Sequence, residues 1–176
     1  MAIDTFFVFS GTYSSVDLAL EDYKAIHELH TDVQLIDAYD AAVIERRKDG
    51  KVKIVKKHET PTRVGGVLGG GVGLATGLVV ALFPAAAIGG GLLLATTGGG
   101  AALGAVAGHA AAGMSRSDLK DLGEELDKGE AGLVVVGVSD LQSKIEAAMK
   151  NAEKVAEKEL KADTAAVEAD AKESGQ

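Results

Sequence analysis

The chain has 176 residues, a formal net charge of −8, no cysteine and no tryptophan. The lack of cysteine excludes disulfides, thiolate catalysis and Cys-ligated metals. The acidic balance argues against broad nucleic-acid binding, because neutralising phosphates needs a basic surface. The N-terminus has no basic region ahead of its first apolar run, so it is not typical of a secretion signal.

The N-terminal region predicts a buried strand and an amphipathic helix. Residues 5–9 (TFFVF) are aromatic and β-branched, which is typical of a strand. Ser14 and Asp17 have the spacing of a capping box, which predicts a helix over residues 15–30. The residues expected on its buried face are Ala19, Tyr23, Ile26 and Leu29 or His30.

A β-hairpin is expected next. Residues 33–47 predict a long strand, with a bulge around the DAYDAA stretch. Asp49-Gly50 is a typical signal for a two-residue hairpin turn. Residues 51–58 then alternate between apolar and basic side chains, as a half-buried return strand does.

The central segment, residues 64–115, contains no Asp, Glu, Lys or Arg and holds 16 of the 23 glycines. Glycine recurs at every fourth residue in two sets, which on a helix gives a smooth stripe that another helix can approach closely. We expect helices over residues 64–83 and 92–113 that form a hairpin around Pro84. The stripe glycines, which are the expected self-association residues, are Gly65, Gly69, Gly73, Gly77, Gly100, Gly104 and Gly108.

Two environments suit this segment. The first is a membrane that the hairpin enters or crosses, because twenty helical residues rise about 30 Å, the hydrocarbon thickness of a bilayer. The second is the shared core of a soluble homo-oligomer, since Gly and Ala outnumber the larger apolar residues of a robust span. A disordered linker is disfavoured by the interspersed Val, Leu and Phe. A phosphate-binding loop is disfavoured because the segment has no GKS or GKT ending.

The C-terminal part predicts a helix, a strand and a second helix. A capping box at Ser115 opens a helix that ends near residue 127. The apolar run 132–138 (GLVVVGV) is suited to a central strand. Another capping box, at Ser139, begins the last helix, and a polar, flexible tail is expected from residue 161. The apolar residues of the last helix are Leu141, Ile145, Ala148, Ala152 and Val155.

Together these elements predict an α+β fold, a ferredoxin-like βαββαβ sandwich in which two helices cover a four-stranded antiparallel sheet. The glycine-rich hairpin is inserted between the third strand and the second helix, so its two ends are expected to lie close together. A C-terminal helix follows the last strand. The expected boundaries are residues 1–61 for the first half of the sandwich, 62–114 for the hairpin, 115–160 for the second half with the C-terminal helix, and 161–176 for the acidic tail.

The glycine-rich run and the following residues 113–138 (GMSRSDLKDLGEELDKGEAGLVVVGV) resemble a bacterial family of domain-of-unknown-function proteins, described as predicted membrane or general-stress-type proteins. The family pattern is a Gly/Ala-rich hydrophobic hairpin, a small helix with Leu-Gly-Glu, and then a glycine and an apolar strand. Leu122, Gly123 and Glu124 match the helix motif, and Gly129 precedes the strand. The resemblance implies a membrane-linked, self-associating protein and carries no catalytic residues.

Basic residues flank the uncharged segment on both sides. Attraction to anionic lipid headgroups would explain them, and so would an ordinary solvated strand face with edge protection. Because both flanks are basic, the positive-inside rule places both on the cytoplasmic side. The candidate lipid-headgroup contacts are Lys56, Lys57, Arg63 and Arg116.

No catalytic or metal-binding pattern is evident in the sequence. His27 and His30 are three residues apart on the predicted helix, but no third ligand stands at a useful spacing, so we expect no metal site. His109 is expected near the end of a helix rather than inside a bundle. The serines and histidines lack the surroundings of a nucleophile elbow or triad, so we expect neither an enzyme nor a cofactor.

The sequence therefore predicts a non-enzymatic, membrane-associated structural or stress-related protein that self-associates through its hairpin. Its globular part is expected at the inner face of the cell membrane. The alternatives are a fully cytoplasmic homo-oligomer whose hairpins share a core, and a small-ligand sensory module. The expected partners are further copies of the chain and anionic membrane lipids, with no nucleic acid.

Overall fold

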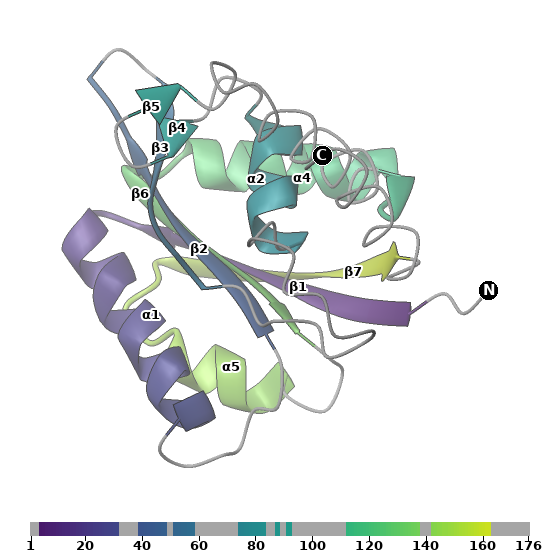
Figure 1. The fold of residues 1–176 in the computed structure, drawn as a ribbon, viewed down its shortest axis with the longest axis horizontal. Coiled ribbons are helices and arrows are strands. Elements are labelled where there is room, and N and C mark those ends of the chain that lie inside the picture. Colours follow the sequence, from purple (N-terminus) through teal and green to yellow (C-terminus); the bar gives the residue numbers. More distant parts are fainter. Residues whose placement is uncertain are drawn as a thin grey trace, which may run out of the picture.

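The computed structural model describes residues 4–31, 39–48, 51–58, 74–83, 87–88, 91–92, 112–137 and 142–162. Within them an antiparallel sheet of five long strands forms the middle layer, and helices cover both of its faces (Figure 1). The elements in chain order are β1 (Asp4–Tyr13), α1 (Val16–Thr31), β2 (Tyr39–Arg46), β3 (Val52–His58), α2 (Leu74–Leu82), β4 (Ala87–Ile88), β5 (Gly91–Leu92), α4 (Arg116–Asp127), β6 (Ala131–Gly137), α5 (Gln142–Ala148) and β7 (Lys154–Ala162).

The strand order is β5-β4-β3-β2-β6-β1-β7. β6 lies between β1 and β2 and is antiparallel to both. The prediction used β3 as the third strand of a ferredoxin-like sheet, and this assignment is wrong: β3 pairs with β2 at the outside of the five long strands. The connection through α1 joins β1 to β2 across β6, and the one through α5 joins β6 to β7 across β1. The α+β class is confirmed, but the predicted order of elements is not matched.

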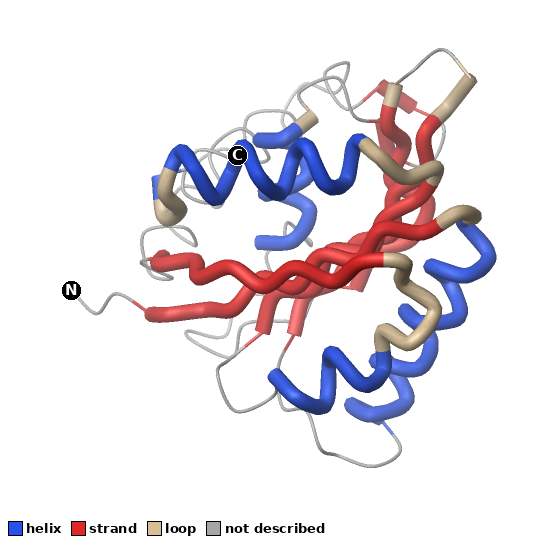
Figure 2. The backbone as a smooth tube through the Cα atoms, turned by 180° about the vertical axis from the view of Figure 1, so that it is seen from behind, coloured by secondary structure: helices blue, strands red, loops and turns tan. Residues whose placement is uncertain are grey.

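Each face of the sheet carries its own apolar core. α1 and α5 cover one face, and α2 and α4 cover the other, as the view from behind also shows (Figure 2). β6 contributes to both cores and is buried along its whole length. The unbroken apolar run predicted a central strand, and this prediction is confirmed, because a strand covered on both faces has no solvent side that needs polar residues.

The predicted C-terminal helix is wrong beyond Ala148, where α5 ends. The chain then forms β7, which pairs with β1 from Lys154, opposite Thr12, to Ala162, opposite Asp4. Ala, Glu and Lys in this stretch favour a helix in isolation, but intrinsic propensity is worth only tenths of a kcal/mol per residue. Completing the ladder with β1 and burying Leu160 outweighs it.

Local signals located several other elements correctly. Ser115 caps α4 as predicted, since its hydroxyl accepts a hydrogen bond from the Asp118 amide at 3.0 Å. The cap of α1 is Ser15 rather than Ser14, because the Leu18 amide donates to the Ser15 hydroxyl. The β2–β3 hairpin forms, and a bond from the Arg47 amide to the Lys51 carbonyl leaves three residues between them instead of a two-residue turn. Asp49 and Gly50 themselves lie outside the described residues.

The uncharged segment follows the predicted helical hairpin only in part where the structure describes it. α2 lies within the predicted first helix, residues 64–83, of which residues 64–73 are outside the described part of the chain. Between Pro84 and the predicted second helix, β4 pairs in parallel with β3 and in antiparallel with β5, and only Leu92 of these two strands falls within that predicted helix. These short strands extend the sheet at its β3 edge. The other residues of the two predicted helices lie outside the described part of the chain, except for 112–113 beside α4.

The described residues on either side of the uncharged segment lie at opposite edges of the five-stranded sheet, which does not favour the expectation that its two ends lie close together. The segment leaves the sheet at the end of β3 and returns at Gly113, whose carbonyl accepts a bond from the Lys161 amide of β7 at 2.9 Å. Four strand spacings separate β3 from β7, which is about 19 Å. Between these edges α2 contacts β2 and β6, so the insertion supplies part of the cover of this face.

Candidate functional site

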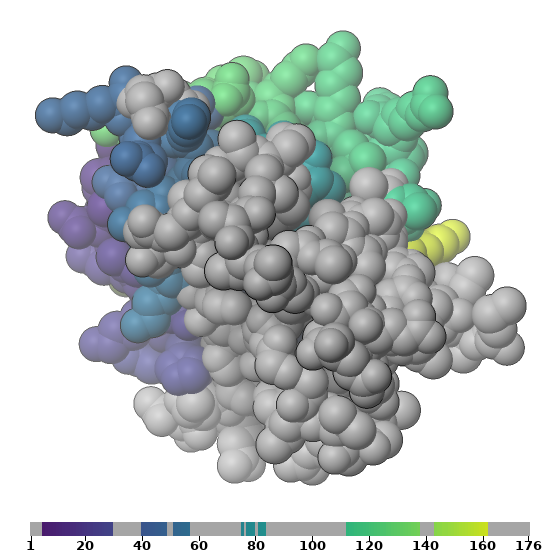
Figure 3. Space-filling view, turned by 45° about the horizontal axis from the view of Figure 1, so that its top comes forward, coloured from purple at the N-terminus to yellow at the C-terminus, as the bar shows by residue number. Residues whose placement is uncertain are grey.

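The helix α2 of the uncharged segment is a core helix of the domain. α2 packs on the sheet through Ala75, Leu78 and Val79, each at most 1 % exposed. Gly77, one of the predicted stripe glycines, is also buried. In the space-filling view α2 (teal) lies between α4 (green) and the β2–β3 strands (blue) (Figure 3). Burial against its own sheet therefore explains why this helix carries no charge. The remaining stripe glycines, Gly65, Gly69, Gly73, Gly100, Gly104 and Gly108, lie outside the described residues.

The Leu-Gly-Glu motif lies where α4 meets α2. A methyl group added at Gly123 would approach the Leu82 side chain to 3.7 Å, an ordinary van der Waals distance. Leu82, Phe83 and Leu119 pack around this junction and are only partly buried. The motif thus forms part of the contact between α2 of the insertion and α4, which follows the insertion in the chain.

The two predicted lipid contacts whose side chains the structure describes, Lys56 and Arg116, lie on opposite faces of the sheet. The Lys56 amino group lies 5.8 Å from the centre of the Tyr23 ring on the α1 face of the sheet. Arg116 is exposed at the start of α4, on the opposite face. Lys57 lies in β3 with its side chain undescribed, and Arg63 lies outside the described residues. A further basic residue, Arg46, is paired with Asp127 of α4, so part of the basic hairpin is engaged within the domain.

The histidines give no metal site in the described part of the chain. The His27 ring is stacked on Tyr23, with ring centres 6.5 Å apart and planes 4° apart. The His30 side chain and the whole of His109 fall outside what the structure describes. Among the described residues no group of three His, Asp or Glu side chains could hold a metal ion.

A buried carboxylate, which the sequence analysis missed, joins three elements. Asp22 of α1 is 1 % exposed and accepts three hydrogen bonds. The Tyr13 hydroxyl donates at 2.9 Å, the Asn151 backbone amide at 2.9 Å and the Asn151 side-chain amide at 2.8 Å. Burial, together with the neighbouring carboxylate, raises the pKa of Tyr13 far above its usual range. Each group has its partners within the network, so its role is to fix α1 to β1 and to the α5–β7 connection.

An ion-pair cluster fixes α4 to β7. The Lys158 amino group lies 3.2 Å from Asp118 and 3.3 Å from Asp121, and Lys154 lies 2.8 Å from Glu125. Hydrogen bonds from Ser115 and Lys158 lower the pKa of Asp118, and bonds from Lys154 and Lys128 lower the pKa of Glu125. Hydrogen bonds to Asp118 and Asp121 raise the pKa of Lys158.

These shifts predict a stability that falls in acid. A carboxylate whose pKa is lower in the folded state stabilises that state above its unfolded pKa and loses the effect as pH falls through the folded value. We therefore expect the free energy of unfolding to decrease below about pH 4.5. Asp118→Asn should flatten this decrease in urea titrations followed by circular dichroism between pH 7 and pH 3. An unchanged pH profile in the variant would show that Asp118 contributes nothing to it.

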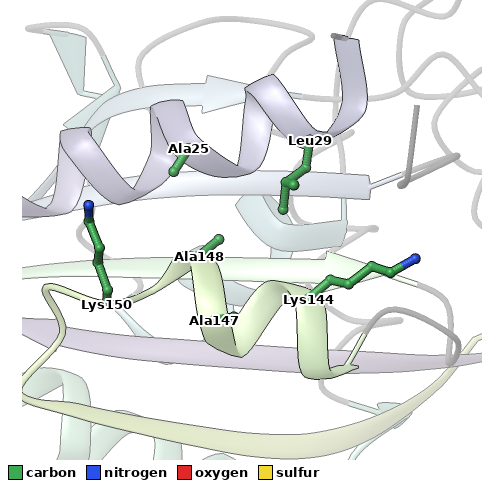
Figure 4. Close-up of a pocket in the computed structure, with 6 residues that line it drawn as sticks. All are labelled: Ala25, Leu29, Lys144, Ala147, Ala148 and Lys150. Carbon is green, nitrogen blue, oxygen red and sulfur yellow. The ribbon is translucent and has the colours of Figure 1, made fainter. Parts of the chain in front are cut away.

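A shallow groove of about 390 Å³ separates α1 from α5 (Figure 4). Ala25 and Leu29 point from α1 toward α5, and Ala148 points back toward α1. The lysines stand at the two ends of the groove on the α5 side. The residues that line it are Ala25, Leu29, Lys144, Ala147, Ala148 and Lys150. Small side chains on both helices thus leave an apolar hollow open to solvent.

Comparison of the chain with protein families, with curated proteins and with solved structures finds no match. None of the helices in the described ranges is long and apolar enough to cross a bilayer.

Proposed function

We propose that this chain is a non-enzymatic protein that self-associates through its uncharged segment, residues 64–115. The observation that carries the proposal is the way in which α2, a helix of this segment, is buried. Over these residues the chain has no charged side chain, and α2 shows how such a sequence is stabilised, with Leu78 and Val79 fully buried against protein. The segment is much longer than α2. Further copies of the chain would bury its other apolar residues by the same kind of packing.

A membrane-surface version of this proposal follows from the resemblance and from the basic flanks. In it the segment associates at the inner face of a bacterial cell membrane and anionic lipids bind the flanking lysines and arginines. The packing of α2 on its own sheet favours the alternative, a homo-oligomer whose segments share a protein core. The cover of one sheet face by α1 and α5 suits either version, because it leaves the opposite face for α4 and the insertion.

The stripe can be tested with a matched pair of substitutions. Gly73→Leu changes a stripe residue, whereas Gly71→Leu makes the same change two positions away, on the other side of a helix. Since overpacking costs about 1–3 kcal/mol at each contact, we expect Gly73→Leu to reduce the mass of the assembly in light scattering and Gly71→Leu to preserve it. Equal masses for parent and Gly73→Leu would refute association through the stripe.

Fractionation separates the two versions. Cells that contain the parent chain are lysed, their membranes are pelleted, and the chain is measured in the pellet and in the supernatant before and after a carbonate wash. The membrane version requires retention in the pellet, whereas recovery in the supernatant as a large assembly supports the shared protein core.

A further inference from the structure

We propose that the α1–α5 groove is a second self-association surface, on which a second copy of this chain docks across a two-fold axis. This surface lies on the opposite face of the sheet from α2, so it is independent of the uncharged segment. Its features are an apolar floor and two rims of opposite charge.

The rim on α1 is acidic. Glu21 and Glu28 lie four residues before and three after Ala25, so they are its neighbours on the helix surface. Lys24 lies in the same row and is 3.9 Å from Glu28, an exposed pair of little energetic weight. With Asp17 one turn earlier, the row carries three carboxylates and one amino group.

The rim formed by α5 and the turn that follows it is basic. Lys144 lies in α5, three residues before Ala147, and Lys150 lies in the turn after the helix, and all three side chains are exposed. Neither lysine forms an ion pair within the described part of the chain. The carboxylate of α5, Glu146, is two positions from Lys144 and therefore projects from the opposite side of the helix.

The two rims run in opposite chain directions with matching ends. Glu21 accepts a hydrogen bond from the Asn151 side chain at 3.2 Å, so it lies at the Lys150 end of the groove. Leu29, which follows Glu28, lines the groove together with Lys144 at the other end. Each end of the groove therefore has a carboxylate on one rim and an amino group on the other.

This arrangement is complementary to itself. A two-fold axis that runs along the groove exchanges its two sides and preserves its ends. The acidic rim of each copy then faces the basic rim of the other, with Glu21 opposite Lys150 of the second copy and Glu28 opposite its Lys144. The alanines allow the helices to approach closely at the centre. A two-fold axis across the groove would instead place like charges together.

The surface is small, which sets the expected strength. α1 has 16 residues and is about 24 Å long, so two such helices bury less than the roughly 1,600 Å² of a standard interface. We therefore expect a weak dimer that is populated at high micromolar concentration, and that weakens at high salt because the rim charges are exposed.

The absence of cysteine makes site-specific cross-linking a direct test. Full-length Ala25→Cys and Ala147→Cys chains, distinguished by an affinity tag on one of them, are mixed and oxidised. Facing grooves place the second copy's α1 over α5, so we expect a mixed disulfide dimer. Replacing Ala147→Cys by Glu146→Cys moves the thiol to the far side of α5 and should lower the yield at least several-fold. Equal yields from the two mixtures would overturn the proposal.

Charge reversal tests the orientation within the same assay. Adding Glu28→Lys to the Ala25→Cys chain places two amino groups together and should reduce the yield. Adding Lys144→Glu to the Ala147→Cys chain should then restore it. No restoration would exclude the two-fold arrangement proposed. If the chain associates only through residues 64–115, the two cysteine positions should give equal yields. A negative result for the groove would therefore not count against association through residues 64–115.

Discussion

Asp22→Ala is expected to remove about 3–5 kcal/mol of the free energy of unfolding. The substitution leaves the Tyr13 hydroxyl and the two Asn151 amide donors without their acceptor. Each buried polar group that loses its partner costs about 1–3 kcal/mol, and a domain of this size is stable by only about 5–15 kcal/mol. Urea denaturation followed by far-ultraviolet circular dichroism measures the loss.

Glu28→Ala is the matched control, because it removes an exposed carboxylate from the same helix and should change stability by less than about 1 kcal/mol. Tyr13→Phe removes one donor and should cost less than Asp22→Ala. Combining the two should cost less than their sum, since both act on one hydrogen bond. An Asp22→Ala chain as stable as the Glu28→Ala chain would show that the network does not hold α1 in place.

Two glycines, one inside α4 and one just after it, are expected to respond to alanine with opposite signs. At Gly129 a methyl group would lie 2.4 Å from the Thr12 methyl carbon, 2.9 Å from the Ala131 carbonyl oxygen and 3.0 Å from the Tyr13 carbonyl oxygen. Backbone atoms cannot move aside cheaply, so Gly129→Ala should destabilise the protein by about 2–3 kcal/mol.

Gly123 lies inside α4, and its nearest neighbour, the Leu82 side chain, would be 3.7 Å from an added methyl group. Alanine is the better helix former, so Gly123→Ala should stabilise the protein by about 0.5–1 kcal/mol. Thermal or urea unfolding of the two variants side by side checks both signs. Destabilisation by Gly123→Ala would indicate a tighter contact with α2 than ordinary packing.

Hydrophobic periodicity and capping residues predicted the elements that are determined by their local sequence. Ser115 with the apolar row of α4 marked that helix, and the run GLVVVGV marked β6 as central. The same run also indicates that both faces of the sheet are covered, which the prediction of a two-layer sandwich did not take into account. A strand without polar residues on either side needs cover on both faces, so α2 and α4 had to lie opposite α1 and α5.

β7 was beyond local signals, because its residues favour a helix and only the ladder with β1 makes them a strand. Asp22 could have been predicted as buried, since it lies three residues after Ala19 and four before Ile26 on the inward row of α1. Its partner Asn151 could not, because it belongs to a connection far along the chain. The groove likewise depends on how α1 and α5 lie side by side, which neither helix alone encodes.

The position of β1 determines when the protein can fold during synthesis. Both of its neighbours, β6 and β7, belong to the last third of the chain. At about 5–20 residues per second, the ribosome releases the uncharged segment several seconds before those strands exist. During this interval α2 has no completed sheet on which to pack. A nascent chain is therefore most open to chaperones, to membranes and to its own copies before β7 emerges, and long-range pairing of this kind also slows folding.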